Sequence, residues 1–408
     1  MAYIPPHMRQ SKGGATSSPP SPASPPESVI PRFQRNLKLV SKDRPKEIVY
    51  AENAISKWFV VGLADDSRVS NLTRLEPVAV ESFERKSGEK PLSLVLKENG
   101  DEACEFLENP WNFVAETVKQ DLFSSFQQVK DEMRGYGYGE IKPTLLLRFG
   151  RILFHGNRSF TAESMIGSSP PIRTLKQMRK SFYTNLPPAY AEYITSDVVP
   201  QSDFKFEEKE LYQVKLSDNM QPGSTISCKC TVAKATNQLE LFKIESNQVC
   251  NLVADMSCLD KNLDLRLMLC TKRILVALTD EELENIKSLI ISARLDSEVK
   301  GGLRWPLGKE SSGNRYTVVG VWHTNSETFT NSSMRLKVRH ADRFDFRSSS
   351  GEVAKEVSLT MPGIVPVLRE QMVNTDLALE MLKENLKLIW KHFLLPGSYT
   401  RKTEQLAL

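Results

Sequence analysis

The sequence predicts an α+β protein: antiparallel sheets with helices on one face, preceded by a disordered N-terminal tail. Two observations predict the body. Runs of strand-like segments are each followed by an amphipathic helix, and this order favours antiparallel sheets with the helices segregated to one side. The regular strand–helix alternation of a doubly wound parallel sheet is absent. The third observation is the first 45 residues, which are rich in proline and serine.

The tail, residues 1–45, alternates proline with serine and alanine, as at Pro19-Pro20 and Pro25-Pro26. Such a composition cannot bury enough apolar surface to offset its ordering entropy, so we expect no fixed structure. Residues 1–50 hold eight Lys/Arg and three acids, a net charge of +5, while the whole chain carries +4. The basic character therefore belongs to the tail, and the remaining residues sum to −1.

Three helices are predicted from apolar periodicity and end signals. The first begins after Asn109, has Pro110 at its first position and ends at Gly135. The second begins at Thr279, with Glu282 three residues later as in a capping box. The third spans about 376–393, capped by Asn374 or Thr375. Two short helices are also expected, at 172–183 and 188–195.

Strands are predicted where β-branched and apolar residues alternate with polar ones. In the first half these are 57–63, a hairpin of 77–83 and 91–97, and 144–154. In the second half they are 204–216, 224–232, 238–245, 250–256, 263–270, 274–278, 316–323, 334–346 and 353–359. We expect a first α+β sub-domain over 46–200, then a strand-rich α+β sub-domain over 201–408 that ends in a helix.

Composition excludes several classes of protein. No apolar stretch reaches the roughly 18 residues that a membrane-spanning helix needs. The N-terminus lacks the apolar core of a secretory signal, since Pro5 and Pro6 interrupt it. We therefore expect a cytosolic or nuclear protein, although the acid-free residues 1–26 leave an organelle transit peptide open.

The sequence contains no recognisable catalytic motif. The segment from Gly302 to Lys309 resembles a phosphate-binding loop, but five residues separate its glycines and Glu310 replaces the Ser/Thr that would bind Mg²⁺. Five of the six cysteines lie between Cys228 and Cys270 without the spacing of a zinc site, so we expect buried thiols. No catalytic residue, metal or cofactor is predicted, and an enzyme is the less favoured interpretation.

The segment 334–346 gives the strongest surface signal. Arg335, Lys337, Arg339 and Arg343 share one parity, together with Asp345, while the other parity carries Leu336, Val338, Phe344 and Phe346. On a strand, such cations form a row with a spacing of about 6.7 Å. A row of this kind can follow phosphate groups, although a solvated sheet face has the same pattern.

The N-terminus resembles two known patterns. Tyr3-Ile4-Pro5-Pro6-His7-Met8-Arg9 resembles a segment near the start of some DEAD-box RNA helicases and, more loosely, the motif that docks on the cap-binding translation initiation factor. This resemblance implies a partner motif at Tyr3 and Met8, with Met8 where that motif has leucine. Ser18, Ser21 and Ser24 each precede proline and are candidate phosphorylation sites.

A longer resemblance covers most of the chain. The opening Met-Ala-Tyr-Ile-Pro-Pro-His, the segment 48–59 and the residues 392–397 resemble a family of uncharacterised plant proteins. The resemblance implies a plant, non-secreted protein with a domain of unknown function, and it transfers no site residues.

These features lead to a functional hypothesis with two alternatives. The basic tail, its helicase-like opening and the basic strand favour a non-enzymatic binding module for RNA or RNA-associated proteins. The first alternative is an enzyme or small-ligand binder with a pocket between sheet and helices, lined by Gly139, His155 or His323. The second is a structural partner in a larger complex. The oligomeric state does not follow from the sequence.

Overall fold

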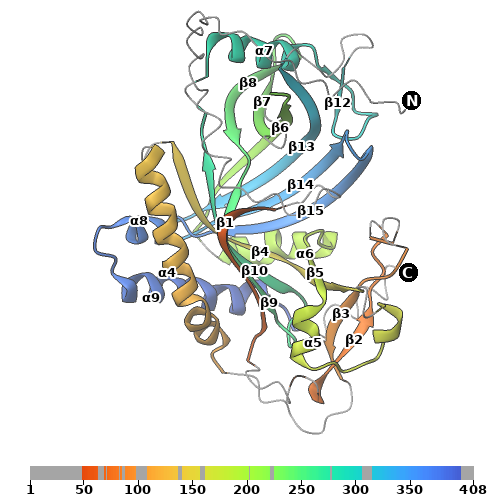
Figure 1. Ribbon diagram of the computed structural model, residues 1–408, viewed down its shortest axis with the longest axis vertical. Coiled ribbons are helices and arrows are strands. Elements are labelled where there is room, and N and C mark those ends of the chain that lie inside the picture. The colour runs from red at the N-terminus through yellow and green to blue at the C-terminus, as the bar shows by residue number, and fades with distance from the viewer. Residues whose placement is uncertain are drawn as a thin grey trace, which may run out of the picture.

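The protein is α+β, with a large mixed sheet and helices against its outer side (Figure 1). The computed structural model describes residues 48–396 apart from 63–68, 70, 82, 85–87, 98–107, 137–139, 157–160, 202, 221–224, 276–277 and 306–314. Thirteen of its strands form one sheet, and two short strands, β11 (Arg294–Leu295) and β12 (Leu303–Arg304), pair separately. The predicted fold class is confirmed. The tail over 1–45 lies outside the described residues.

The elements have the following bounds. The strands are β1 Val49–Val60, β2 Thr73–Pro77, β3 Leu92–Leu96, β4 Ile141–His155, β5 Arg179–Tyr183, β6 Lys205–Asp218, β7 Thr225–Ala233, β8 Gln238–Ser246, β9 Val249–Ser257, β10 Asp264–Arg273, β11 Arg294–Leu295, β12 Leu303–Arg304, β13 Tyr316–Thr330, β14 Arg335–Asp345 and β15 Ser350–Thr360. The helices are α4 Pro110–Tyr136, α5 Ile172–Gln177, α6 Pro188–Tyr193, α7 Asp280–Ile291, α8 Ile364–Arg369 and α9 Thr375–Leu388. The 3₁₀ helices are η2 Glu163–Met165 and η4 Val199–Gln201, and the π helices are η3 Ile194–Val198 and η5 Ile389–Phe393.

Eight strands of the large sheet close into a ring. Their order is β10-β4-β15-β14-β13-β6-β7-β8, and every neighbouring pair is antiparallel. The ring closes where Glu245 on β8 forms an antiparallel bridge with Ile274, just beyond the end of β10. The backbone N–H of Leu275 also donates to the Ile244 carbonyl at 3.1 Å. We call these eight strands the ring.

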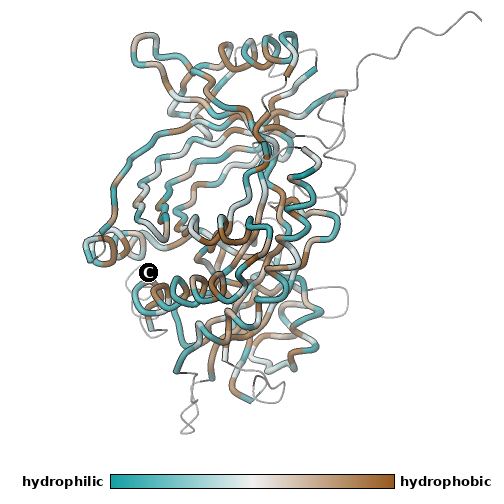
Figure 2. The backbone as a smooth tube through the Cα atoms, turned by 90° about the vertical axis from the view of Figure 1, so that its left-hand side faces the viewer, coloured by the Kyte–Doolittle hydropathy of each residue, from teal (hydrophilic) through white to brown (hydrophobic). Residues whose placement is uncertain are grey.

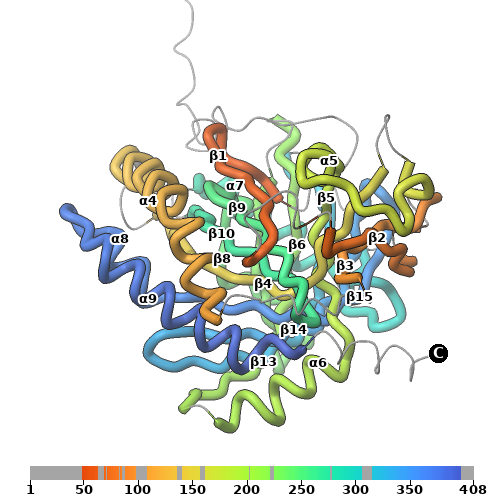
Figure 3. The backbone as a smooth tube through the Cα atoms, turned by 90° about the horizontal axis from the view of Figure 1, so that it is seen from below, coloured from red at the N-terminus to blue at the C-terminus, as the bar shows by residue number. Residues whose placement is uncertain are grey.

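The outward face of the ring is apolar and is covered by helices. On one side Leu265, Leu147 and Leu359 pack with α4, α8 and α9 in the largest core cluster. On the other side Val214 and Cys228 pack with α7 in a second cluster. Figure 3 shows α4 and α9 running side by side along the sheet. Hydropathy alternates along the strands (Figure 2), so the opposite, inward face is left to the polar residues.

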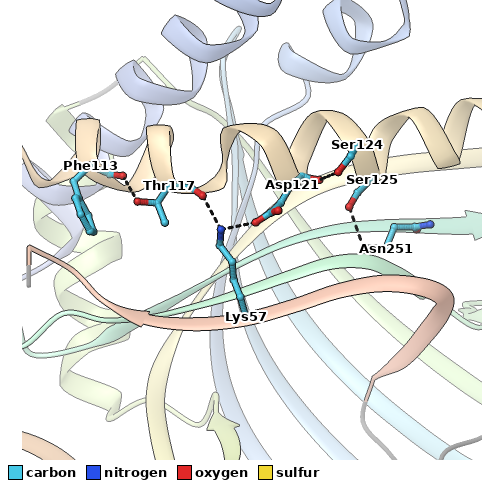
Figure 4. Close-up of polar contacts among 7 residues, drawn as sticks. All are labelled: Lys57, Phe113, Thr117, Asp121, Ser124, Ser125 and Asn251. Carbon is cyan, nitrogen blue, oxygen red and sulfur yellow. Dashed lines mark hydrogen bonds and ion pairs between the residues drawn. The ribbon is translucent and has the colours of Figure 1, made fainter. Parts of the chain in front are cut away.

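Strand β1 joins the sheet beyond the ring, and its pairing with β9 is parallel. Lys57 on β1 ties it to α4: its Nζ donates to the Thr117 carbonyl at 2.6 Å and forms an ion pair with Asp121 (Figure 4). Ser125 on the same helix donates to the Asn251 carbonyl of β9 at 3.3 Å. The helix is therefore fixed to both β1 and β9 by polar contacts as well as by its apolar face.

The predicted helix ends are largely confirmed. Helix α4 begins at Pro110, and α7 has the capping box, in which Thr279 Oγ1 accepts from the Glu282 backbone at 3.2 Å. Asn374 caps α9 by accepting from the Leu377 backbone at 3.0 Å. These features were predictable because capping is a local interaction.

Three predicted elements were wrong in part. The helix over 172–183 ends at Gln177, because 179–183 pairs with β4 as β5, so tertiary pairing outweighs local preference. The first hairpin strand lies at 73–77 and ends at Pro77, which cannot donate to a further ladder bond. In the expected strand 274–278, Ile274 forms only the bridge that closes the ring.

The two expected halves contribute strands to the same sheet. Strand β4, from the first half, lies between β10 and β15 of the second half. The ring is therefore complete only when both halves are present.

Replacing Lys57 with Met will lower the free energy of unfolding by about 1 kcal/mol, because it leaves the partly buried Asp121 and the Thr117 carbonyl without this donor. Urea unfolding monitored by circular dichroism will measure the change. The matched control is Lys387→Met, which removes an exposed lysine paired with Glu384 at 3.5 Å on α9. Equal effects of the two substitutions would show that the β1–α4 contact contributes nothing specific.

Candidate functional site

The inward face of the ring is identified by cross-strand register, because directly opposite residues project from the same face. One row runs Arg148, Ser358, Lys337 and Thr328 across β4, β15, β14 and β13. A second runs Glu356, Arg339, Ser326 and Lys209. A third runs Glu352, Arg343, Trp322, Gln213, Lys229 and Lys243. These three rows are polar and rich in cations, whereas Leu146, Met268 and Cys270 on β4 and β10 form a small apolar cluster on the same face.

A compact group of these residues forms the candidate site, which we call the inward cluster. It consists of Arg148, Lys229, Lys243, Glu245, Lys272, Lys337, Arg339, Arg343 and Glu356. Seven cations and two carboxylates give a formal charge of 7 − 2 = +5 when all are ionised. The residues come from six strands, so the cluster exists only in the closed ring.

Glu356 holds the arginines of the cluster together. Its carboxylate lies 2.5 Å from Arg343 Nη2 and 3.6 Å from Arg339 Nη1, and it accepts from Thr184 Oγ1 at 3.0 Å. Burial alone would raise the pKa of Glu356, but the charges of Arg343, Arg339 and Arg148 lower it to about 2. The side chain therefore stays ionised and offsets part of the repulsion among the three arginines.

Glu245 plays the same part for the lysines. It pairs with Lys229 Nζ at 2.8 Å, with Lys243, and with Lys272 Nζ at 3.8 Å. Burial opposes ionisation of Glu245, but hydrogen bonds from Lys229 and Lys243 and the charge of Lys272 lower its pKa to about 2. The Glu245 side chain is 5 % exposed, so its charge is balanced by these lysines in a largely buried position.

The lysines remain crowded despite these carboxylates. Burial, followed by the charges of Arg339, Lys229 and Lys272, lowers the pKa of Lys337 to about 8. Burial and the charge of Lys229 lower the pKa of Lys272 to about 8 as well, against the opposing effect of Glu245. Strands β6 and β13 separate β7 from β14 in the sheet, so Lys229 and Lys337 interact across the inside of the ring.

Water reaches the cluster, and several of its donors lack partners. The side chains of Lys229, Lys243 and Lys272 keep 21 %, 28 % and 37 % of their surface exposed. Arg339 Nε and Arg343 Nε are buried and have no hydrogen-bond partner. The same is true of Ser227 Oγ on the same inward face. Buried donors without partners also occur elsewhere, as at Arg315 Nε and Trp390 Nε1, and those on the inward face are available to a ligand.

An indole lies beside the cluster on β13. Lys215 Nζ lies 3.8 Å from the centroid of the Trp322 ring, and the Arg343 guanidinium lies 4.8 Å from it. Cation–π contacts of this kind hold flexible cationic side chains in place. Trp322 therefore orients two cations on the inward face.

The four candidates predicted from one strand lie on one face of β14, as expected from their parity. Lys337, Arg339 and Arg343 belong to the inward cluster, and Arg335 lies at the exposed first position of the strand. Sequence reasoning missed the partners from other strands, which are Arg148, Lys229, Lys243, Glu245, Lys272 and Glu356. The alternation in Ser227-Cys228-Lys229-Cys230 does signal a polar face, but it does not tell which strand that face opposes.

The two predicted histidines lie apart from the inward cluster, and the remaining predicted residues lie outside the described part of the chain. His155 is buried and lies 2.6 Å from Ser181 Oγ, while His323 stacks on Tyr212 and lies 2.7 Å from Glu210 on the outward face. Gly139 lies outside the described residues, as do Tyr3, Met8, Ser18, Ser21 and Ser24.

The described cysteines are buried, as predicted: Cys228, Cys230, Cys250, Cys258 and Cys270. Burial raises the pKa of Cys230 to about 12, so this thiol is unreactive at neutral pH. Within the described ranges, no three His, Cys, Asp or Glu side chains gather as metal ligands would. None of the described helices combines the length and the apolar composition that a membrane-spanning segment requires.

A cavity of about 210 Å³ lies on the outward side of the ring beside α6. Its lining includes Glu192, Glu208 and Glu327 together with His340 and Lys355. Because its lining mixes acidic and basic side chains and gathers no charge of one sign, this cavity is a weaker candidate for a binding site than the inward cluster.

Comparison with known proteins identifies a family and some similar structures. The model of DUF7903, described as a domain of unknown function, matches residues 42–393. A comparison with curated proteins found no match.

Among solved structures, the S. pombe Pct1 RNA triphosphatase aligns at 9 % identity and a TM-score of 0.40, over 73 % of this chain and 96 % of that one. The Mimivirus capping enzyme triphosphatase aligns at 8 % identity and a TM-score of 0.29, over 71 % and 99 %. A conserved hypothetical protein from Pyrococcus furiosus aligns at 9 % identity and a TM-score of 0.23, over 52 % and 92 %. All three TM-scores are below 0.5, so the interpretation of the ring rests on its own residues.

Replacing Glu356 with Gln will lower the free energy of unfolding by about 3 kcal/mol, because it leaves three arginines facing one another without a counter-charge. Glu384→Gln on α9, an exposed partner of Lys387, is the control and will change little. The folded-state pKa of Glu356 is about 2 and the ordinary value is 4.5, so its contribution is complete above pH 4.5 and is lost as pH falls toward 2. Urea unfolding at pH 7 and pH 3 will measure both effects; a wild-type-like variant at pH 7 contradicts this role.

Replacing Lys272 and Lys337 together with Met will raise stability at pH 7. Both lysines have a folded-state pKa of about 8 against an ordinary 10.5, so the unfolded chain binds more protons between these values. Stability of the wild type therefore rises with pH from about 8 to about 10.5, and the double variant loses this rise. Unfolding midpoints across pH 7–10 will test this, with Lys287→Met/Lys387→Met as control. An unchanged pH slope in the double variant would contradict the assignment.

Proposed function

The chain belongs to the DUF7903 family, described as a domain of unknown function, and we propose that it binds RNA by holding a phosphorylated end inside the ring. The observation that carries the proposal is the convergence of cations from facing strands. Lys229 on β7 and Lys272 on β10 both pair with Glu245 Oε2, at 2.8 Å and 3.8 Å, and the charges of both lysines add to the effect of burial in lowering the pKa of Lys337 on β14.

Phosphate is the anion that best matches these donors. Arginines bind phosphate oxygens with two parallel hydrogen bonds, and lysines add point charges. The unpartnered Nε atoms of Arg339 and Arg343 and the hydroxyl of Ser227 offer further donors to such oxygens. A ligand carrying several negative charges would also relieve the repulsion that lowers the pKa values of Lys272 and Lys337.

The width of the ring favours the end of a strand over a duplex. A closed ring of about eight strands leaves an interior that side chains fill or that holds one small ligand. A nucleic-acid double helix does not fit such a space, whereas a terminal phosphate group does. The basic N-terminal 50 residues, with a net charge of +5, would add sequence-independent attraction for the remainder of an RNA.

A second candidate is a small phosphorylated ligand with no RNA attached. It is favoured by the same limit on the width of the ring. In this case the inward cluster would make all of the contacts with the ligand, and the N-terminal residues would contribute nothing to affinity. A pocket between the sheet and the helices is less favoured, because apolar side chains fill the space under α4, α7, α8 and α9, and the cavity beside α6 has a lining of mixed charge.

The proposal predicts that full-length protein will bind a labelled single-stranded RNA with a 5′-triphosphate at least about tenfold more tightly than the same RNA with a 5′-hydroxyl. Fluorescence anisotropy at two salt concentrations will measure the affinities. Lys272→Met/Lys337→Met will lose the preference, because it removes two of the converging charges. Lys287→Met on the outward helix α7 is the matched control and will keep it.

The competing interpretations predict different results in that assay. Inorganic tripolyphosphate that binds as tightly as the RNA would favour the small-ligand candidate. Equal affinity for the two RNAs, unchanged in the double variant, would overturn a phosphate site in the ring. Comparison of the full chain with residues 46–408 will assign any remaining affinity to the N-terminal residues or to the fold.

A further inference from the structure

The carboxylates of the inward cluster are paired with cations, and this pairing affects the form in which a phosphate ligand can bind. We infer that the ring binds its phosphate groups as the free polyanion, without a bridging divalent cation. The inference rests on the proposed phosphate site and specifies the form in which the ligand enters it. It is argued from the partners of each inward carboxylate and from the charges around them.

The two carboxylates within the cluster are already paired with cations. Glu356 contacts Arg343 and Arg339, and it also accepts a hydrogen bond from Thr184. Glu245 contacts Lys229, Lys243 and Lys272 through both of its oxygens. A metal ion at either carboxylate would have to displace these cations and then remain among them.

Asp345 shares the inward parity of Arg343, but its carboxylate accepts from the backbone N–H groups of Arg347 and Ser348 and pairs with the Arg347 side chain. Glu352 and Glu207, which also take inward positions, are too far apart to act together. Glu352 lies opposite Arg343, which in turn lies opposite Trp322 on β13. Glu207 lies opposite Thr328, six positions farther along β13. Six strand residues span about 20 Å, so these two carboxylates cannot share one ion. Mg²⁺ in phosphate sites is usually held by one or two carboxylates together with the phosphates.

The surrounding charge also opposes a divalent cation. Lys272 and Lys337 already bind their protons less readily because of burial and neighbouring positive charge, and an added charge of +2 would meet the same repulsion. Seven cations in the cluster can neutralise a polyphosphate directly. A phosphate ligand complexed with Mg²⁺ would bring less negative charge to this site than the free ligand.

Isothermal titration calorimetry of the full chain with inorganic tripolyphosphate at pH 7 will test the inference. Binding is expected in EDTA and will weaken about tenfold in excess Mg²⁺, relative to NaCl at the same ionic strength. Glu245→Gln will bind tripolyphosphate more tightly in EDTA, because it releases three lysines to the ligand. Glu284→Gln, on the outward helix α7, is the control and will leave affinity unchanged.

The outcomes separate this inference from the function on which it rests. Binding that requires Mg²⁺, or Mg²⁺-dependent release of phosphate from tripolyphosphate, would keep the phosphate site and overturn the metal-free mode. Weaker Mg²⁺-dependent binding by Glu245→Gln would do the same, since it would identify Glu245 as a metal ligand. No binding in any buffer would remove the phosphate site itself, and the inference with it.

Discussion

Like charges held close together on the inside of a closed ring are the constraint around which this molecule is organised. Strands alternate their side chains between two faces, and the apolar faces here are buried under α4, α8 and α9 on one side and α7 on the other. Once the sheet closes with its helices outside, the polar faces can only meet one another inside. Apolar packing on the outward face therefore provides the stability that keeps the inward cations together.

Glu356 and Glu245 reduce the electrostatic repulsion among the inward cations. Each occupies a position where it contacts two or more cations, and both remain ionised because those cations lower their pKa values to about 2. They do not neutralise the cluster, and the depressed pKa values of Lys272 and Lys337 show that repulsion remains. Proteins often retain such unfavourable local arrangements where they bind a ligand, since a site optimised for the ligand is not optimised for stability.

The site could be predicted in part. The row on β14 followed from the parity of Lys337, Arg339 and Arg343, because the period of a strand is fixed by its backbone. Lys229 and Lys272 occur in equally regular strands, yet nothing in the sequence indicated that they face β14. That relation depends on ring closure between β8 and Ile274, a contact between residues distant in sequence. The parallel pairing of β1 with β9 and the strand at 179–183 were missed for the same reason.

The sequence by itself determined the local features: the start of α4 at Pro110, the capped starts of α7 and α9, the alternation of most strands, the buried cysteines and the α+β class. These follow from interactions between residues a few positions apart, and from the periods of helix and strand. Only the tertiary structure decided which face of each strand points inward and which cations meet there. The sequence specifies two faces for every strand. The order of the strands and the closure of the ring determine on which side of the sheet the charges of different strands come together.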